Sequence, residues 1–431
     1  IFSTLRAAFE SRGFQPIETP AMEALSTLTG KYGEEGDQLI FKILNNGDFL
    51  SKAKEETLAE RDSKALSFEV SKKALRYDLT VPFARYVVQH QNDIAFPFKR
   101  YQIQPVWRAD RPQRGRYREF YQCDADVVGS NSLLYEVEIV QLLDEVLNNL
   151  GLPDFTIKIN NRKVLSGIAE ITGESDKIID ITVAIDKLDK IGEDGVVKEL
   201  ESKEVSAPAI EKIKPLFLLK GDYKKVISEM KTMLQDSEIG LKGIEELEFI
   251  FETINVLGLK KATFEFDVTL ARGLNYYTGA IFEVSANNVK MGSISGGGRY
   301  DDLTGVFGLK DVSGVGISFG ADRIYDVLEE LELFPEFSAE STQVMLVNFV
   351  VDDLFCLQVL KELRENGINA EYYPSSAKLK KQMKYANDKN IPFVIFINEE
   401  EVASNSLELK NMLTGDQQKL AIKDVITTII D

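Results

Sequence analysis

Two strand-like segments joined by an arginine-rich loop constrain the fold of this chain most. The first segment, 98–107, alternates apolar and polar residues and ends at Arg108. A polar loop, 110–118, follows, and the chain extends again over 119–128. This pattern predicts an arginine-lined β-hairpin.

The arginines of this hairpin indicate a site for phosphate groups. The planar guanidinium fork of arginine matches phosphate oxygens, and an aromatic ring nearby can stack on a base. Phe120 follows Arg116 at four residues, which supplies such a ring. The alternative is a solvated arginine-rich hairpin, which would not need Phe120. The arginines within eleven residues are Arg108, Arg111, Arg114, Arg116 and Arg118.

The rest of the first 330 residues mixes helices with strands. A charged, helix-rich stretch at 174–255, flanked on both sides by strand-like segments, predicts an inserted helical subdomain. The remaining predicted elements are helices at 2–12, 133–150 and 321–331, an extended segment at 14–19 and strands at 262–268, 280–285 and 312–319.

A polar stretch with Pro335 at 334–341 marks a linker before a second unit. Beyond it, strand and helix patterns alternate as βαβαβ, which predicts a small α/β domain with a mostly parallel sheet. These elements are predicted at 343–349, 354–366, 369–373, 377–387 and 393–397.

Composition narrows the functional classes. No stretch approaches the twenty or so apolar residues of a membrane helix, and the first residues lack the apolar core of a signal peptide. The two cysteines, Cys123 and Cys356, lie far apart, which favours a reducing compartment. We therefore expect a soluble cytoplasmic protein that does not associate with membranes.

Metal and general-base chemistry have few candidate residues. One histidine and two cysteines cannot supply four nitrogen and sulfur ligands for structural zinc, so we expect no protein-bound metal site. His90, the one histidine of the sequence, is predicted to occupy a polar position on an amphipathic helix. The net charge of −18 argues against bulk attraction of nucleic acid, so any RNA contact would use local basic patches.

The hairpin resembles motif 2 of the class II aminoacyl-tRNA synthetases. The resemblance implies that Arg108 holds the α-phosphate of ATP, Asp110 meets the adenine amino group, Arg116 takes the γ-phosphate and Phe120 stacks on adenine. The segment 2–20 is similar to motif 1, which forms the dimer interface in that family. The segment 316–324 resembles motif 3, in which Arg323 would bind phosphate, with Ser318 in place of the middle glycine.

Two further segments resemble the histidyl-tRNA synthetases. The string at 270–279 is similar to their signature, with Asn275 where aspartate is usual, and 295–301 resembles their glycine-rich strand and turn. The resemblance implies that the ammonium group of histidine is bound by Asp78, Thr80 and Gln122 and that the imidazole lies between Asp126 and Tyr277, beside Tyr276. It implies catalytic roles for Arg108, Arg272 and Gln122.

The resemblance covers almost the whole chain and implies its organisation and partners. We expect a class II catalytic α+β domain at 1–325 built on an antiparallel sheet, a linker at 326–341 and an anticodon-binding domain at 342–431. L-Histidine, ATP with Mg²⁺ and tRNA would be the substrates of a homodimer. The residues expected to contact tRNA are Arg111, Arg114, Lys380, Lys381 and Lys384.

Two alternatives remain at this point. One is a non-catalytic regulatory relative that resembles the histidyl-synthetase-like subunit of ATP phosphoribosyltransferase. Such relatives usually lack the anticodon-binding domain and parts of motif 2. The other is a class II synthetase for proline, threonine or glycine, which would share the last domain but not the string at 272–277.

Overall fold

The chain forms two compact units, residues 1–333 and 334–431, in this computed structural model. The structure describes residues 1–271, 276–334, 342–349 and 352–430. The division lies inside the segment 326–341, although 326–330 still belong to a helix, α14 (Ala321–Glu330). None of the helices within the described ranges is both long and apolar enough to span a membrane.

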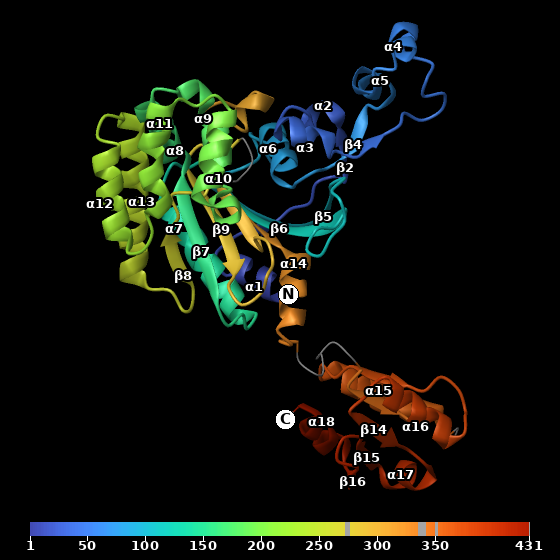
Figure 1. Ribbon diagram of the computed structural model, residues 1–431. Coiled ribbons are helices and arrows are strands. Elements are labelled where there is room, and N and C mark those ends of the chain that lie inside the picture. Colours follow the sequence, from blue (N-terminus) through green and yellow to red (C-terminus); the bar gives the residue numbers. More distant parts are fainter. Residues whose placement is uncertain (272–275, 335–341, 350–351, 431) are drawn as a thin grey trace. The chain divides into compact units, whose positions relative to one another are not determined.

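The first unit is built on an eight-stranded sheet (Figure 1). All neighbouring strands are antiparallel except two pairs, β1 with β5 and β7 with β8. The predicted antiparallel sheet is therefore confirmed. In spatial order the strands are β1 (Gln15–Pro16), β5 (Phe98–Trp107), β6 (Glu119–Val128), β11 (Gly314–Gly320), β10 (Ser295–Tyr300), β9 (Ala280–Ala286), β7 (Phe155–Asn161) and β8 (Thr263–Phe266).

The arginine-lined hairpin is formed by β5 and β6. The two strands pair along their whole length, from Phe98 opposite Val128 to Trp107 opposite Glu119. Alternate residues of a strand face opposite sides of the sheet. The side chains of Gln122, Asp124 and Asp126 on β6 therefore point to the same face.

Helices cover the sheet, and their buried apolar side chains form the larger of the two cores of this unit. The longest helix before the insertion, α7 (Leu134–Asn149), buries Val140, Leu143 and Leu147 at helical spacing. A buried ion pair ties this helix to β10, because both oxygens of Glu136 accept hydrogen bonds from Arg299, at 2.5 and 2.6 Å. The sheet and the helices thereby hold β10 in a fixed place.

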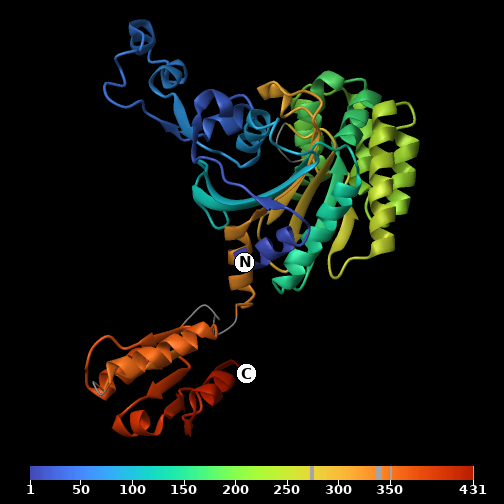
Figure 2. The same ribbon diagram turned by 180° about the vertical axis from the view of Figure 1, so that it is seen from behind.

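The chain between β7 and β8 is helical, as predicted for 174–255, but its helices begin earlier, at Arg162. Its helices stack beside one another at one side of the first unit (Figures 1 and 2). Because β7 and β8 pair in parallel, the chain needs a long crossover here, and the helices provide it. They are α8 (Arg162–Thr172), α9 (Ile178–Ile185), α10 (Leu188–Ser202), α11 (Ala207–Ile213), α12 (Tyr223–Met233) and α13 (Glu238–Leu257).

Residues 22–75 form a part of the fold that was not predicted from the sequence. A three-stranded sheet carries short helices, and α4 and α5 lie away from the large sheet in both views (Figures 1 and 2). The elements are β2 (Met22–Ala24), α2 (Leu25–Leu28), α3 (Gly33–Gln38), β3 (Lys42–Ile43), α4 (Glu55–Glu60), α5 (Ser63–Val70) and β4 (Lys73–Leu75), followed by α6 (Thr80–Gln89).

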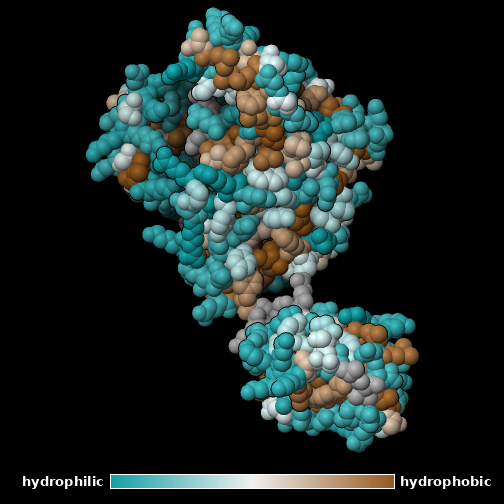
Figure 3. Space-filling model, turned by 90° about the vertical axis from the view of Figure 1, so that its right-hand side faces the viewer, coloured by the Kyte–Doolittle hydropathy of each residue, from teal (hydrophilic) through white to brown (hydrophobic). Residues whose placement is uncertain are grey.

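Apolar side chains also reach the surface of this part of the fold. Figure 3 shows apolar side chains gathered in several places on one face. The exposed ones between residues 44 and 68 are Leu44, Phe49, Leu50, Leu58 and Phe68.

The second unit contains a five-stranded sheet in the order β13, β12, β14, β15, β16. The first three strands are parallel, as the βαβαβ pattern predicts, and an antiparallel pair that was not predicted extends the sheet. The elements are β12 (Val344–Leu346), α15 (Asp353–Glu365), β13 (Ala370–Tyr372), α16 (Leu379–Asp388), β14 (Phe393–Phe396), α17 (Glu399–Ser404), β15 (Leu407–Asn411), β16 (Gln417–Leu420) and α18 (Ile422–Ile430).

Candidate active site

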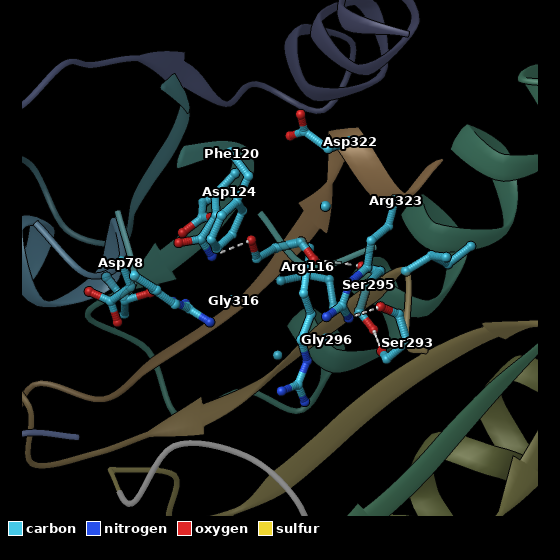
Figure 4. Close-up of a pocket in the computed structure, with 18 of the residues that line it drawn as sticks. Asp78, Arg116, Phe120, Asp124, Ser293, Ser295, Gly296, Gly316, Asp322 and Arg323 are labelled. Atoms are coloured by element: carbon cyan, nitrogen blue, oxygen red, sulfur yellow. Dashed lines mark hydrogen bonds between the residues drawn. The ribbon is translucent and has the colours of Figure 1, made fainter. Parts of the chain in front are cut away.

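A cavity of about 240 Å³ lies in the first unit, and its lining comes from segments far apart in the sequence (Figure 4). Strands β6, β10 and β11 supply one part, and the hairpin loop and the start of α14 supply another. The predicted site residues that line it are Asp78, Thr80, Arg108, Asp110, Arg116, Phe120, Gln122, Asp126, Tyr276, Tyr277 and Arg323.

The cavity has oppositely charged sides. In Figure 4, Asp78 and Asp124 lie on one side, Arg323 and Ser293 lie on the other, and Arg116 lies between them. A molecule that carries a cationic group at one end and phosphates at the other matches this distribution of charge.

Two buried carboxylates and one arginine form the acidic side. Arg100 Nη2 lies 2.7 Å from Asp126 Oδ2 and 3.9 Å from Asp124 Oδ2. The closer contact lies off the axis of a hydrogen bond, so it is an ion pair without one. Burial raises the pKa of both aspartates, and Arg100 opposes that rise. One arginine for two carboxylates leaves an acidic excess that suits a cationic ligand.

Asp126 is fixed by its neighbours. Tyr300 donates a hydrogen bond of 2.7 Å from its hydroxyl to Asp126 Oδ1. Opposite Asp126 on β11 stands Gly316, where an added Cβ would lie 2.0 Å from Asp126 Oδ1. Only glycine therefore leaves room for this carboxylate, which explains the glycine at this position of the motif 3 segment.

Asp78 is a third buried carboxylate and lies just before α6. Tyr32 donates to its Oδ1 at 2.9 Å, and the backbone N–H of Val81 donates to the same oxygen at 3.1 Å. Tyr276 donates to Oδ2 at 3.2 Å. Burial raises the pKa of Asp78, and Arg108 and these donors oppose the rise.

Three arginines form the basic side. Arg323 donates from Nε to the carbonyl of Gly115 and from Nη1 to the carbonyl of Ser293, each at 2.6 Å. Burial lowers the pKa of Arg323, and the positive charges of Arg116 and Arg108 lower it further. Cations held close enough to repel one another form a site for anions, because bound phosphate relieves the repulsion.

Arg108 is held in place by aromatic rings and the backbone. Its guanidinium lies 4.2 Å from the ring centre of Tyr77 and 5.1 Å from that of Phe120, and its Nε donates to the carbonyl of Tyr77 at 3.0 Å. Arg116 is more exposed, and its Nη1 lies 3.8 Å from Asp110 Oδ1.

The hairpin loop is attached to α14. Tyr117 donates from its hydroxyl to the carboxylate of Asp326, and the backbone N–H of Tyr121 donates to Asp322 at 2.7 Å. These bonds join the motif 2 and motif 3 segments, which lie about two hundred positions apart in the chain.

The residues predicted to contact tRNA lie on the surface. Arg111 is exposed, and Arg114 is exposed but paired with Glu330 on α14. In the second unit, Lys380, Lys381 and Lys384 are exposed on α16. Arg272 and Asn275 lie outside the residues that the structure describes.

Metal-ligating side chains do not gather in the described part of the chain. Within the described ranges, no group of three or more His, Cys, Asp or Glu side chains could hold a metal ion. His90 follows the last residue of α6 and lies 3.6 Å from the carboxylate of Asp93.

The large antiparallel sheet, the arginine-lined hairpin and the strand that leads into the Arg323 helix define the class II aminoacyl-tRNA synthetase fold. Comparisons with known proteins agree. The histidyl-tRNA synthetase family model matches residues 1–324, and the anticodon binding domain model matches residues 343–431. The chain belongs to the histidyl-tRNA synthetase family.

Individual relatives match over almost the whole chain. A histidine–tRNA ligase from Christiangramia forsetii is 64% identical over 97% of this chain and 92% of that protein. One from Bacteroides fragilis is 60% identical over 99% of this chain and 94% of that protein. The crystal structure of histidyl-tRNA synthetase from Nostoc sp. PCC 7120 has a TM-score of 0.82 and 33% identity, covering 100% of this chain and 94% of that one.

These matches do not favour the regulatory alternative. The crystal structure of an ATP phosphoribosyltransferase regulatory subunit/histidyl-tRNA synthetase from Bacillus halodurans is 21% identical, with a TM-score of 0.68, which shows a shared fold alone. The more similar relatives carry the ligase name and match both units of the chain.

Several residues that shape the cavity were not predicted. Arg100 on β5 and Tyr300 on β10 reach Asp126 from opposite sides of β6, and Tyr32 reaches Asp78 from the unpredicted segment. Asp124 was overlooked, although its spacing of two from both Gln122 and Asp126 on a predicted strand places all three on one face.

Proposed function

We propose that this chain activates L-histidine with ATP, forming histidyl-adenylate and pyrophosphate, and then transfers the histidine to the 3′ end of its tRNA. The observation that carries the proposal is the cavity itself, in which buried carboxylates face a cluster of arginines. Family membership supports the choice of amino acid and of ATP.

The acidic side would bind histidine. Asp78, with Thr80 and Gln122, would receive the ammonium group. The imidazole would lie between Asp126, which accepts from a ring N–H, and Tyr277, whose hydroxyl donates to the other ring nitrogen. Burial and the nearby aspartates raise the pKa of Tyr277, so its hydroxyl keeps the proton that it donates. A site that pairs both ring nitrogens discriminates strongly against amino acids that lack them.

The basic side would bind ATP. Phe120 would stack on adenine, Asp110 would accept from its amino group, and Arg116 and Arg323 would hold the outer phosphates. Arg108, fixed between two rings, would hold the α-phosphate.

Adenylation joins the two sides. A carboxylate oxygen of histidine attacks the α-phosphorus in line, the new O–P bond forms, and the bond to pyrophosphate breaks. The attacking carboxylate is already ionised, so positioning and charge stabilisation replace a general base. Arg108 would stabilise the developing charge, as would Arg272, whose role rests on the family resemblance.

Magnesium would accompany the ATP phosphates. Mg²⁺ commonly keeps several waters and binds one or two carboxylates together with substrate phosphates. Asp322 at the start of α14, which was not predicted from the sequence as a metal ligand, lines the cavity and fits that requirement. When bound, the ion would neutralise phosphate charge.

Binding of tRNA would use local basic patches in both units. Arg111 and Arg114 lie in the hairpin loop, which borders the cavity where the acceptor end of tRNA would enter. Lys380, Lys381 and Lys384 would contact the anticodon arm. We further propose a homodimer that works in the cytoplasm. Motif 1 supports the dimer, and two free, buried cysteines fit a reducing compartment.

Asp126→Asn tests the histidine side of the site. An amide can accept or donate, so it no longer accepts unambiguously from the imidazole N–H. We expect KM for histidine to rise at least about tenfold, the order of one hydrogen bond to a charged group, while KM for ATP changes little. The exposed Asp93→Asn is the matched control. An unchanged KM for histidine would assign imidazole recognition to other residues.

A further inference from the structure

We propose that Arg100 is a positioning residue that holds the carboxylate of Asp126 ionised and in place for the imidazole of histidine. This inference rests on the proposed function, in which Asp126 accepts a hydrogen bond from a ring N–H. Arg100 does not line the cavity, so it acts on histidine recognition through Asp126 and not by touching the substrate.

The pairing of β5 with β6 places Arg100 directly opposite Asp126. Side chains of opposite residues in an antiparallel pair share one face of the sheet and lie close enough to interact. Arg100 Nη2 lies 2.7 Å from Asp126 Oδ2, and the other oxygen, Oδ1, accepts a hydrogen bond from Tyr300. One oxygen of Asp126 is thus held by a charge and the other by a hydrogen bond.

Arg100 is itself held in place without any ligand. Its side chain is completely buried, and its guanidinium lies 4.3 Å from the ring centre of Phe83 on α6. Its Nη1 donates to Gln102 Oε1 at 3.5 Å. Gln102 donates from Nε2 to Thr19 Oγ1 at 2.8 Å, which leaves its carbonyl oxygen for Arg100. Arg100 therefore presents a fixed positive charge to β6.

The carboxylates of β6 are balanced by this one charge. Within the described ranges, no lysine and no second arginine forms an ion pair with Asp124 or Asp126. Burial raises the pKa of the two nearby tyrosines, so neither is charged, and β11 adds only Gly316 opposite Asp126. The ionisable groups around the two carboxylates are Arg100 on β5, Tyr300 on β10, Tyr277 before β9 and Asp78 before α6.

A buried carboxylate that lacks a cation takes up a proton, because an isolated charge is costly away from water. Burial raises the pKa of Asp126, and Arg100 opposes that rise. A protonated Asp126 would carry an O–H group, which donates and leaves less capacity to accept from the imidazole. The ion pair with Arg100 thus preserves the acceptor that the ring N–H requires.

Arg100→Met replaces the cation by an apolar side chain. We would measure KM for histidine in ATP–pyrophosphate exchange from pH 7 to pH 8.5. Dividing each value by that of the unmodified protein at the same pH cancels the titration of free histidine. Buried carboxyls without a cation can have a pKa of about 8 to 9, and apparent affinity falls with the ionised fraction. The ratio should therefore be at least about tenfold at pH 7 and fall several-fold by pH 8.5, while KM for ATP stays within about twofold.

Arg100→Lys keeps a positive charge at the same position and separates charge from shape. Its ratio should be the same at every pH, although the smaller head group can raise it uniformly. A positive charge that restores the flat pH profile is the result expected if Arg100 acts on the ionisation of Asp126.

A charge-balanced variant answers the question if Arg100→Met is too unstable to assay. Removing one partner of a buried ion pair is destabilising, because it leaves an uncompensated charge. Arg100→Met combined with Asp124→Asn removes one positive and one negative charge together, and Asp126 still lacks its cation. Its KM for histidine, divided by that of Asp124→Asn alone, should fall from pH 7 to pH 8.5 in the same way.

Lys158→Met on β7 is the matched control. It also removes the cation of a partly buried ion pair in the same sheet, here with Asp267, outside the residues that line the cavity. Its ratio should stay near one at every pH. A ratio for Arg100→Met that does not change with pH would overturn the proposal, as would an equal pH dependence in Arg100→Lys. Failure of the unmodified protein to show histidine-dependent exchange would instead refute the proposed function.

Discussion

Arg108 combines the features expected of a residue that stabilises a transition state. The rings of Tyr77 and Phe120 and the Tyr77 carbonyl fix its guanidinium before substrate binds. A charge that is already in place needs no reorganisation during the reaction. Its contribution should therefore appear in the rate of the chemical step.

Arg108→Ala should lower kcat for exchange by roughly 2 to 4 kcal/mol of transition-state stabilisation, the range for one preorganised donor. The protein should remain folded, with an unchanged circular dichroism spectrum. Arg61→Ala, at the exposed end of α4, is the control and should keep full activity. A loss of less than tenfold would contradict the role assigned to Arg108.

Asp124 links the site to stability. Burial raises its pKa to about 7 from the ordinary 3.8, with the negative charge of Asp126 adding to the rise and Arg100 opposing it. The folded protein thus holds this proton more tightly than the unfolded chain. The stability it contributes is complete below pH 3.8 and is lost as the pH rises to about 7.

Asp124→Asn removes this titration. We would measure the melting temperatures of the ligand-free variant and of the unmodified protein at pH 5 and pH 8. The variant's value minus that of the unmodified protein should be larger at pH 8 than at pH 5. Asp93→Asn, a change at an exposed position, should show no such pH dependence. An equal difference at both pH values would mean that Asp124 does not hold its proton in the folded protein.

The sequence could predict site residues that lie close together in the chain, and it failed where strands bring distant residues together. Arg108, Arg116 and Phe120 are recognisable because fixed spacing on a hairpin is itself the signal. Arg100 reaches Asp126, and Gln122 reaches Ser318, only through the pairing of β6 with its two neighbours. The spacing of residues along the chain does not determine which residues pair across strands, so these contacts could not be predicted from the sequence.

Helices and strands differ in how well the periodicity of their apolar residues predicts them. Long amphipathic helices such as α7 and the paired strands of the hairpin were predicted, because many residues repeat the same periodicity. The strands β2, β3 and β4 have only two or three residues each, too few to establish a period of two. The antiparallel strands β15 and β16 were also missed. They carry many polar residues, so the alternation of apolar and polar residues is weak in them.

The lysines of helix α16 allow a test of tRNA binding by a single element of the fold. The exposed Lys380, Lys381 and Lys384 lie on a helix of the anticodon-binding unit, and Lys384 pairs with Asp388 at 2.5 Å. Changing all three to alanine should raise KM for tRNA and flatten its salt dependence, because each phosphate contact adds a salt-dependent contribution to binding.

Exchange without tRNA separates binding from folding in this variant. It should be unaffected, since the cavity lies in the other unit. Lys361→Ala on α15 is a control, because Lys361 is an exposed lysine of the same unit that pairs with Glu365. Equal losses of exchange and aminoacylation would indicate a folding defect, and no loss in either would make α16 an ordinary solvated face.

The charge of the whole molecule makes local patches necessary. The net charge is −18, and even residues 341–431 carry 10 Lys and Arg against 13 Asp and Glu. Long-range attraction of a polyanion is therefore unfavourable. We therefore expect the chemistry in the first unit, where arginines are concentrated, and tRNA recognition by small basic surfaces on both units.

Amino-acid-dependent ATP–pyrophosphate exchange, measured with all twenty amino acids, tests whether this site activates histidine. We predict exchange that requires Mg²⁺ and is stimulated by L-histidine alone, because Asp126 and Tyr277 present partners for two ring nitrogens. Exchange stimulated by proline, threonine or glycine but not by histidine, or no exchange with any amino acid, would contradict the account.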